Sequence, residues 1–225
     1  MDRILVSSPR YLVTSPWLQP VREKCAVVPL GVDSQRFAPP AEPYAGRPTL
    51  LFVGRLRYYK GLGVLIDALT ELQGVRLLVA GTGPMESEWR ARASQRGVAE
   101  RVVWLGEVAD AELPGVLAAG DVFALPAVAR SEAFGTVLLE AMASRRPVVS
   151  TELGTGTSWV NVHGTTGLVV PPGDPPALAR ALGTLLSDDG LRRRMGEAGH
   201  ARVRAELTQA RMVARVESLY REVAA

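Results

Sequence analysis

The chain has 225 residues, of which 47% are hydrophobic, so it can build one large domain or two small ones around a real core. Its formal net charge of +3 is mildly basic, and much of the excess arginine lies late in the chain. Acidic residues are interspersed there and aromatic residues are sparse, so solvated helix faces explain the charge better than a membrane or nucleic-acid partner.

The cysteines and histidines exclude several classes of site. Cys25 is the only cysteine, so neither a disulfide framework nor a thiolate metal site is expected. His163 and His200 are too few and too scattered to predict a metal cluster. No apolar run is long enough for a membrane span, and the first residues lack the apolar core of a signal peptide. We therefore expect a soluble, cytoplasmic chain.

The first part of the chain predicts a fragment of a domain. A strand is predicted over residues 3–7, a short helix over 9–18 and an extended segment over 26–33. One strand and one helix cannot bury their own apolar faces. Residues 1–36 are therefore expected to be the end of a domain whose remainder is absent, with an apolar patch left exposed. The proline-rich residues 37–48 predict a linker.

From residue 49 the pattern alternates between short apolar runs and helical stretches. Strands are predicted over residues 49–53, 75–80, 102–105, 122–125, 148–150 and 168–170. Helices are predicted over residues 61–72, 85–96, 110–119 and 135–143, followed by a helical tail from about residue 175. The strands show little alternation, which is typical of parallel strands buried on both faces. The predicted fold class is α/β, with a doubly wound, Rossmann-like parallel sheet over residues 49–206 and a C-terminal helix over 207–225.

Ligands bind outside the carboxyl ends of the strands in an open parallel sheet. The loop after the first of these strands carries Gly54, Arg55 and Lys60. Lys60 lies close to a predicted helix start, where the helix dipole disfavours a cation unless an anion is bound. A diphosphate would resolve that conflict, with Arg55 as a fork-shaped donor and Lys60 as a point charge. The alternative is two surface cations beside an ordinary glycine turn, which the loop alone does not exclude.

The loops after the next two strands are weaker signals. Gly81 and Gly83 would let the backbone approach a ligand, but a tight turn from strand to helix explains them equally well. Their spacing also departs from the G-x-G-x-x-G pattern of dinucleotide sites. Val108 could offer backbone groups to a nucleotide base, although by itself a simple strand end is the better explanation.

Glu132 and Glu140 form the most informative pair in the chain. They lie on either side of an expected helix start at residues 134–135, where unpaired N–H groups and the helix dipole suit a phosphate. Both carboxylates can accept hydrogen bonds from hydroxyl groups. Together with the helix start, they predict a site for ribose, diphosphate and sugar. Glu140 could instead be an exposed helix residue, and Glu132 a capping neighbour. However, Glu140 interrupts an otherwise apolar helix, where a carboxylate without partners is costly.

Five motifs occur in an order that resembles a known family. They are residues 28–33 (Val-Pro-Leu-Gly-Val-Asp), residues 54–56 with Lys60 and Gly61, residues 80–84 (Ala-Gly-Thr-Gly-Pro), residues 132–143, and residues 167–174 (Gly-Leu-Val-Val-Pro-Pro-Gly-Asp). In this order they resemble the C-terminal, donor-binding half of retaining GT-B glycosyltransferases of family 4, nearly from end to end. Residues 152–161 further resemble bacterial members that build surface polysaccharides.

The resemblance implies a role for each candidate residue. Arg55 and Lys60 would bind and stabilise the leaving diphosphate and Glu132 would meet the transferred sugar, so these three would be the catalytic residues. Glu140 would hold the ribose hydroxyls. The remaining contacts to the nucleotide sugar would come from Gly54, Gly81, Gly83, Val108, Gly135, Thr136 and Val137. No cofactor and no metal is expected for binding.

The resemblance also implies what surrounds this chain. The full enzyme would transfer a UDP- or GDP-linked sugar to an acceptor hydroxyl with retention of configuration, in bacterial polysaccharide or glycolipid synthesis. Most of the N-terminal acceptor domain has no counterpart here, including the region that usually carries a catalytic histidine and a glycine-rich loop. The last helix would cross back to that domain through the apolar positions Met212, Val216, Leu219 and Val223.

Two other functions stay open. The isolated chain could be a non-catalytic module that binds a nucleotide sugar, since it has no acceptor site. A phosphorylase or epimerase could share the architecture, but a phosphorylase would carry a pyridoxal phosphate lysine in a longer chain. The expected partners are a nucleoside diphosphate sugar and the missing acceptor domain, with no nucleic acid. Peripheral contact of the full enzyme with the inner face of the cell membrane is left open.

Overall fold

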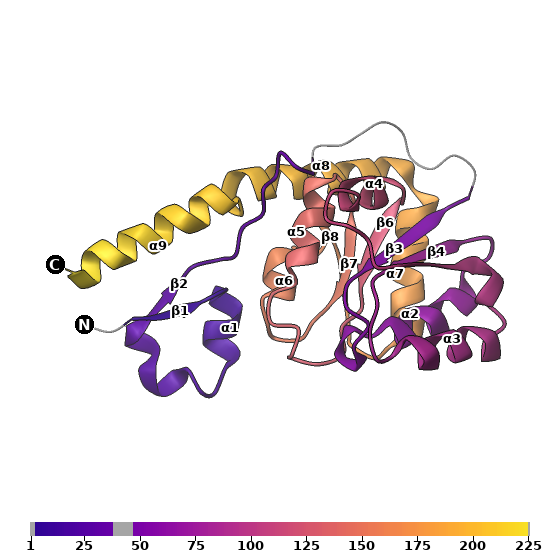
Figure 1. The fold of residues 1–225 in the computed structure, drawn as a ribbon, viewed down its shortest axis with the longest axis horizontal. Helices are drawn as coiled ribbons and strands as arrows, with labels where there is room; N and C mark the ends of the chain where they lie inside the picture. Colours follow the sequence, from indigo (N-terminus) through magenta and orange to yellow (C-terminus); the bar gives the residue numbers. More distant parts are fainter. Residues whose placement is uncertain (1–2, 38–46, 225) are drawn as a thin grey trace.

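The computed structural model describes residues 3–37 and 47–224. Figure 1 shows a larger α/β unit and, beside it, a small unit formed by the first strands and α1. The last helix, α9 (Gln209–Ala224), leaves the larger unit and extends over the small one. The described helices include none that is long and apolar enough to cross a membrane.

The larger unit is built on a parallel sheet of six strands. The strands are β3 (Thr49–Val53), β4 (Arg76–Ala80), β5 (Val102–Gly106), β6 (Val122–Leu125), β7 (Val148–Thr151) and β8 (Gly167–Val170). Their order is β5-β4-β3-β6-β7-β8, and all pairs are parallel. The predicted α/β fold class with a doubly wound parallel sheet is confirmed. The strand order reverses between β3 and β6, and in such sheets ligands bind in the crevice at this point.

Two hydrophobic cores cover the two faces of the sheet. The first contains Leu50 and Phe52 of β3 and is covered by α2 (Leu62–Ala68), α3 (Glu86–Gln95) and α7 (Pro175–Ser187). The second contains Leu51 of β3 and is covered mainly by α4 (Leu113–Ala118), α5 (Thr136–Ala143) and α8 (Asp189–Glu206). Successive strand residues point to opposite faces, and both faces are buried in the central strands β3, β4, β6 and β7, whereas Val103 and Leu105 of the edge strand β5 are exposed. This explains why the strands lack a polar alternation.

Several helix boundaries differ from the predictions. The predicted helix over residues 61–72 is α2 followed by the 3-10 turn η3 (Leu69–Glu71), and the helix predicted over 110–119 is limited to α4. The short α6 (Thr157–Val160) was not predicted as a helix, because its glycine- and threonine-rich surroundings carry no helical pattern. Further 3-10 turns are η2 (Tyr58–Lys60) and η4 (Ala99–Arg101).

The small unit consists of residues 3–27. β1 (Ile4–Val6) pairs in parallel with β2 (Cys25–Val27), and between them lie α1 (Pro9–Thr14) and the 3-10 segment η1 (Gln19–Lys24). The helix predicted over residues 9–18 is too long, because Ser15 precedes Pro16 and adopts an extended conformation. The prediction of a simple extended exit over residues 26–33 was also incomplete, since its start belongs to β2.

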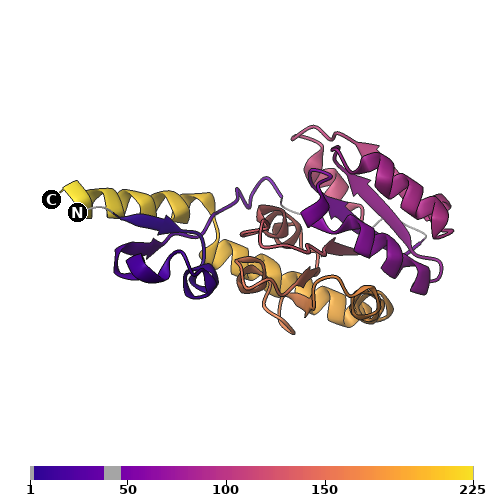
Figure 2. The same cartoon turned by 90° about the horizontal axis from the view of Figure 1, so that it is seen from below.

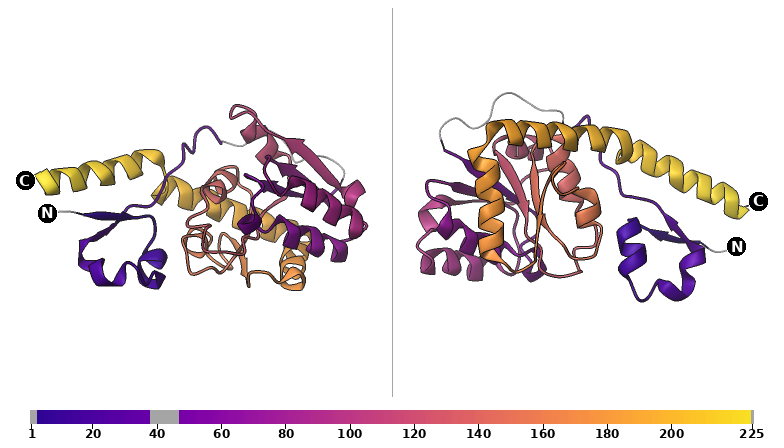
Figure 3. Two further views of the ribbon diagram at one scale, coloured as in Figure 1. Left: turned by 60° about the horizontal axis from the view of Figure 1, so that its bottom comes forward. Right: turned by 180° about the vertical axis from the view of Figure 1, so that it is seen from behind.

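Apolar side chains of the small unit remain exposed. The exposed fractions are 53% for Leu5, 58% for Val13 and 85% for Trp17. A hollow of about 240 Å³ lies between this unit and α9, lined by Arg3, Leu5, Val216, Leu219, Tyr220 and Val223. Figures 2 and 3 show α9 running beside the small unit, well away from the six-stranded sheet. All four predicted apolar crossover positions, Met212, Val216, Leu219 and Val223, belong to this helix, of which no described residue is buried, and three of them line the hollow.

The segments that enter and leave the larger unit are joined to each other. The Val32 N–H donates to Leu207 O and the Gln209 N–H donates to Val32 O, each at 3.0 Å. A Cβ at Gly31 would lie 2.3 Å from Thr208 O, so only glycine allows this approach. Phe37, the first residue of the predicted linker, is buried in the second core. Residues 38–46 of that linker lie outside the described part of the chain.

Candidate functional site

The crevice at the carboxyl ends of β3, β4 and β5 holds the first group of predicted residues. It is a hollow of about 450 Å³ lined by Val53, Gly54, Arg55, Ala80, Gly81, Thr82, Gly83, Glu107, Val108 and Leu113. Five of the six residues predicted from these three loops therefore lie together, namely Gly54, Arg55, Gly81, Gly83 and Val108, whereas Lys60 does not line this hollow. The Arg55 side chain is exposed and has no ion pair within residues 3–37 and 47–224, which leaves its guanidinium available to an anion.

The glycines of these loops hold the two neighbouring backbones against each other. Gly81 has φ +124°, and a Cβ there would lie 2.1 Å from Gly54 O. A Cβ on Gly83 would lie 2.5 Å from Leu56 O. The Leu56 N–H also donates to Thr82 O at 2.9 Å. Packing of the two loops thus accounts for Gly81 and Gly83, and any contact with a ligand would be an additional role.

Lys60 and Glu132 meet at the point where the sheet order reverses. Lys60 ends η2 after β3, and Glu132 lies on the loop after β6. Lys60 Nζ is 2.5 Å from Glu132 Oε2, and only 13% and 9% of the two side chains are exposed. A buried carboxylate requires such a partner. The sequence analysis did not foresee this ion pair, because 72 positions separate the two residues and neither local pattern refers to the other.

The carboxylate of Glu132 still has an unused acceptor. Oε2 contacts the ammonium group of Lys60, and no other described residue donates a hydrogen bond to either carboxylate oxygen. A carboxylate can accept several hydrogen bonds, so a ligand can still donate to Glu132. A hydroxyl group of a bound molecule would be such a donor. Gly54 has φ +145°, which favours glycine, although a Cβ there would make only an ordinary contact with Cε of Lys60 at 3.6 Å.

Glu140 lies on α5, the helix that starts at the same crevice. Gly135 forms the N-cap of α5 with φ +78°, and the first amides after it, at Thr136 and Val137, have no preceding helical turn to bond to. Burial raises the pKa of the Glu140 carboxyl, an effect that Asp110 reinforces and that Arg36 and Lys60 oppose. Glu140 is thus partly buried and within electrostatic range of Lys60 and Arg36, while its contact with a ribose stays a prediction.

Arg36 is a member of this site that the sequence analysis missed. It lies on the segment that enters the larger unit, and its side chain pairs with Asp110 at 3.8 Å while also bonding the Asp110 carbonyl. Its positive charge acts on Glu140 and opposes the rise in the pKa of that carboxyl. No sequence signal could have identified Arg36, because it precedes a proline-rich segment and follows no strand of the sheet.

The loop after β7, residues 152–158, joins the site to the small unit. Arg130 Nη1 donates to Leu153 O at 3.0 Å and to Gly154 O at 3.2 Å, and Nη2 donates to Thr14 Oγ1 at 3.1 Å. Thr14 Oγ1 also donates to Gly154 O. Arg10 and Glu152 form an ion pair at 3.3 Å. The helix α1 therefore contacts the same loops that carry Glu132.

This contact is expected to weaken in acid. Burial alone would raise the pKa of Glu152, but hydrogen bonds from Gly154 N and Ser158 Oγ and the charge of Arg10 outweigh it and lower that pKa. A lowered pKa contributes stability above the usual glutamate range, and this contribution is lost as the pH falls through the lowered value. We expect the NMR signals of Thr14 and Gly154 to move in that acidic range.

The Glu152→Gln variant provides the comparison. It should show the signals of the loosened contact even at neutral pH, because the ion pair with Arg10 is then absent. Glu88→Gln, at an exposed position on α3, should titrate like the parent. Unchanged Thr14 and Gly154 signals throughout the acidic range would show that Glu152 does not hold α1.

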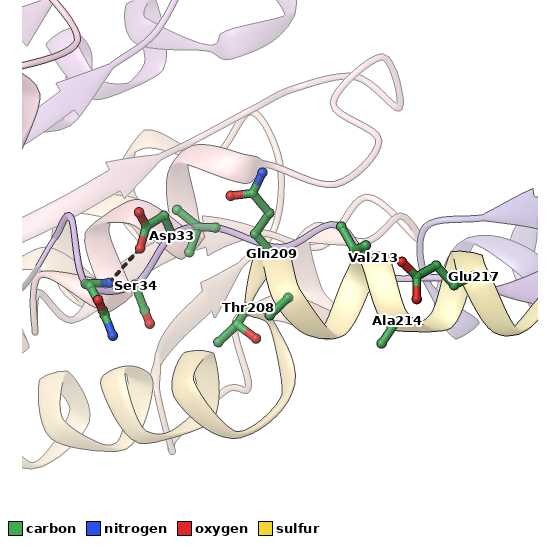
Figure 4. Close-up of a pocket in the computed structure, with 10 residues that line it drawn as sticks. Asp33, Ser34, Thr208, Gln209, Val213, Ala214 and Glu217 are labelled. Atoms are coloured by element: carbon green, nitrogen blue, oxygen red, sulfur yellow. Dashed lines mark hydrogen bonds between the residues drawn. The ribbon is translucent and has the colours of Figure 1, made fainter.

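A larger hollow lies elsewhere in the described structure. About 710 Å³ in volume, it is lined by Val32, Asp33, Ser34, Gln35, Thr208, Gln209, Ala210, Val213, Ala214 and Glu217. Figure 4 shows these side chains on the segment before the sheet and on α9. It contains none of the predicted site residues, and its lining offers two carboxylates, Asp33 and Glu217, with no cation. It is therefore a poor site for a phosphate.

The chain has many relatives among known proteins. The family described as "Glycosyl transferases group 1" matches residues 33–202. D-rhamnosyltransferase WbpZ of Pseudomonas aeruginosa is 39% identical over 217 residues, which cover 92% of this chain and 56% of that protein. O-antigen chain mannosyltransferase C of Escherichia coli is 38% identical over 229 residues, covering 98% of this chain and 60% of that protein. The chain therefore spans somewhat more than half the length of these relatives.

The solved structures agree with the architecture. Sucrose-phosphate synthase from Thermosynechococcus elongatus superposes with a TM-score of 0.88 at 29% sequence identity. The match covers 97% of this chain and 57% of that one. Since nearly all of the described chain takes part, the small unit and α9 are included in the likeness, and the predicted GT-B type of fold is supported along the whole chain.

Proposed function

The chain belongs to the group 1 glycosyl transferases, and we propose that it is the donor-binding half of a retaining enzyme of family 4. It binds a nucleoside diphosphate sugar without a metal. The observation that carries this proposal is the buried Lys60–Glu132 pair, which lies at the switch point of the sheet and leaves one carboxylate acceptor unused. A site with a cation, a helix start and two carboxylates matches a diphosphate flanked by two polyhydroxylated groups.

In this proposal the parts of the donor are divided among the residues of the crevice and of the adjoining loops. The base enters the hollow near Val108, with Gly81 and Gly83 on its wall. The diphosphate lies between Arg55, Lys60 and the first amides of α5, at Thr136 and Val137. The ribose meets Glu140 and the transferred sugar meets Glu132. Each carboxylate then accepts from hydroxyl groups, and each cation faces an oxyanion.

The proposed reaction is a transfer of the sugar to an acceptor hydroxyl. The bond between the anomeric carbon and the diphosphate oxygen breaks, and the acceptor oxygen bonds the anomeric carbon on the same face. The acceptor proton leaves with the diphosphate. Arg55 and Lys60 stabilise the negative charge that develops on the leaving group, which is where such donors contribute most to the rate. Glu132 orients the sugar, and its charge favours the positive character of the anomeric carbon.

The names of the relatives support a hexose or deoxyhexose donor and a polysaccharide product, as in O-antigen synthesis. The acceptor site would belong to an N-terminal domain that packs on residues 3–27 and α9, where apolar side chains are exposed. The alternative is a non-catalytic nucleotide-sugar binding module. A transfer assay with the chain alone and with a longer form that includes an upstream domain distinguishes the two.

Binding itself is tested by calorimetric titration of UDP, GDP, UDP-glucose and GDP-mannose into the chain. One base is expected to be preferred, for the free diphosphate and for the sugar nucleotide alike. Arg55→Ala should weaken both ligands by about tenfold, the effect of one charge-assisted hydrogen bond, and more at low salt.

Arg57→Ala is the matched control for Arg55. Arg57 is also exposed and lies two positions away, but it does not line the crevice. It should bind both ligands like the parent. Equal losses of affinity for the two variants would show that Arg55 acts only through the general charge of the surface. If the parent binds none of the four compounds, the proposed function is refuted.

A further inference from the structure

Three buried hydroxyl groups occur close together at the carboxyl end of β7. Thr151, Thr155 and Thr157 have exposed fractions of 2%, 0% and 0%. A buried hydroxyl needs a hydrogen-bond partner, and each of these three donates to a backbone carbonyl or to a neighbour. Thr151 Oγ1 donates to Ala127 O at 2.5 Å, and Thr157 Oγ1 donates to Thr151 O at 3.2 Å. The function proposed above assigns no role to any of them.

Thr155 differs from the other two in its partner. Its Oγ1 donates to the backbone carbonyl of Glu132 at 2.8 Å, across 23 positions of sequence. The next residue continues the contact, since the Gly156 N–H donates to Ala133 O at 2.7 Å. A Cβ at Gly156 would lie 2.9 Å from Ala133 O, so the two loops touch backbone to backbone.

The peptide of Glu132 is consequently held at both ends. Its N–H donates to Ala129 O at 3.0 Å, and its carbonyl accepts from Thr155. The side chain is held by Lys60. With the two peptide groups that flank the Cα atom of Glu132 both held, the direction of its Cα–Cβ bond is fixed as well. The carboxylate therefore points in one direction without a bound ligand.

We propose that Thr155 is a positioning residue for the donor sugar: its hydroxyl fixes the peptide of Glu132 and so orients the carboxylate that receives the sugar. This inference rests on the proposed function, which assigns the sugar to Glu132. A site that must hold a hydroxyl group tolerates little displacement of its acceptor, because hydrogen bonds weaken steeply when distance or angle changes. Thr155 never touches the nucleotide part of the donor.

The test compares a free nucleoside diphosphate with its sugar nucleotide, which differ only by the sugar. Thr155→Val removes the hydroxyl at nearly constant volume, and Thr155→Ser keeps it. Thr49→Val is the matched control, since Thr49 is also fully buried and its Oγ1 donates to a backbone carbonyl, that of Arg47, at the opposite end of the sheet. Each variant is titrated with UDP and UDP-glucose, and with GDP and GDP-mannose, by calorimetry.

We expect Thr155→Val to weaken the sugar nucleotide by about tenfold, the equivalent of one hydrogen bond. Its affinity for the free diphosphate should stay within about twofold of the parent, and Thr155→Ser should restore the sugar nucleotide. Thr49→Val can lower the melting temperature but should not change the ratio of the affinities for the sugar nucleotide and the free diphosphate. A purely structural role for Thr155 would lower the melting temperature and leave the ratio of the two affinities unchanged.

The outcomes separate this inference from the proposed function. If Glu132→Ala loses the sugar nucleotide selectively but Thr155→Val does not, the positioning role is wrong and the function stands. If Thr155→Val weakens both ligands equally, the role is likewise wrong. If the parent binds none of the free diphosphates and none of the sugar nucleotides, the proposed function fails, and the role of Thr155 fails with it.

Discussion

Replacing Lys60 with methionine is expected to lower the free energy of unfolding by about 3 kcal/mol, the lower end of the cost of breaking a buried ion pair. The substitution keeps the apolar stem but removes the ammonium group that lies 2.5 Å from Glu132. Glu132 would then be a carboxylate with 9% of its side chain exposed and no cation beside it. Chemical denaturation of the ligand-free chain measures the loss.

The double variant Lys60→Met with Glu132→Gln identifies the cause. Removal of the stranded charge should restore most of the stability, because replacing both members of a buried pair costs far less than replacing one. A single variant as stable as the parent would show that the pair contributes nothing. A double variant as unstable as the single one would assign the loss to packing of the lysine stem.

Replacing Glu140 with glutamine is expected to stabilise the free chain and to weaken its ligands. Burial raises the pKa of Glu140, so the folded state prefers the protonated carboxyl. The ionised form therefore costs stability, and this cost appears as the pH rises from the ordinary glutamate range through the raised value. A glutamine never ionises. Its gain in melting temperature should be present at neutral pH and absent in acid.

The affinity of Glu140→Gln for its ligands should decrease, in contrast to its stability. If Glu140 holds ribose, then the loss of its charge removes a pair of charge-assisted hydrogen bonds, worth roughly 1.5–3 kcal/mol. The free diphosphate and the sugar nucleotide contain the same ribose, so both should weaken alike. A variant that gains stability and keeps full affinity would place the ribose elsewhere. A variant that loses stability at neutral pH would contradict the assigned effect of burial.

The strands and the loops that follow them could be predicted because their signals are local. Buried parallel strands such as residues 122–125 read as short apolar runs, and glycine or proline marks where they end. The helix start at Gly135 was visible for the same reason. Because the carboxyl ends of parallel strands meet at one edge, the order of the elements was enough to place Arg55, Lys60 and Glu132 on loops at the same edge of the sheet.

The remaining features depend on contacts between distant residues. The pairing of Lys60 with Glu132, the approach of Arg36 to Glu140 and the bond from Thr155 to the Glu132 carbonyl join segments that carry no common pattern. The length of α1 was misjudged for a local reason, since the effect of Pro16 on Ser15 was overlooked. The roles of the site residues stay predictions, because each depends on a bound donor.

The ion pair between Lys60 and Glu132 leads to a more specific prediction for a Glu132 variant. In the free chain Glu132 holds Lys60, so its removal leaves an ammonium group that is free to approach a phosphate. Glu132→Ala should therefore bind the free nucleoside diphosphate at least as tightly as the parent. The sugar nucleotide loses its acceptor for the sugar hydroxyl, and should bind to the variant about tenfold less tightly than to the parent. Glu140→Ala provides the contrast, since it should weaken both ligands to the same degree.

The most direct test of the account is the calorimetric titration of Glu132→Ala with the preferred nucleoside diphosphate and with its sugar nucleotide. The account predicts an unchanged or tighter diphosphate and a sugar nucleotide that is about tenfold weaker than in the parent. Equal losses of affinity for the two ligands would contradict the assignment of the sugar to Glu132.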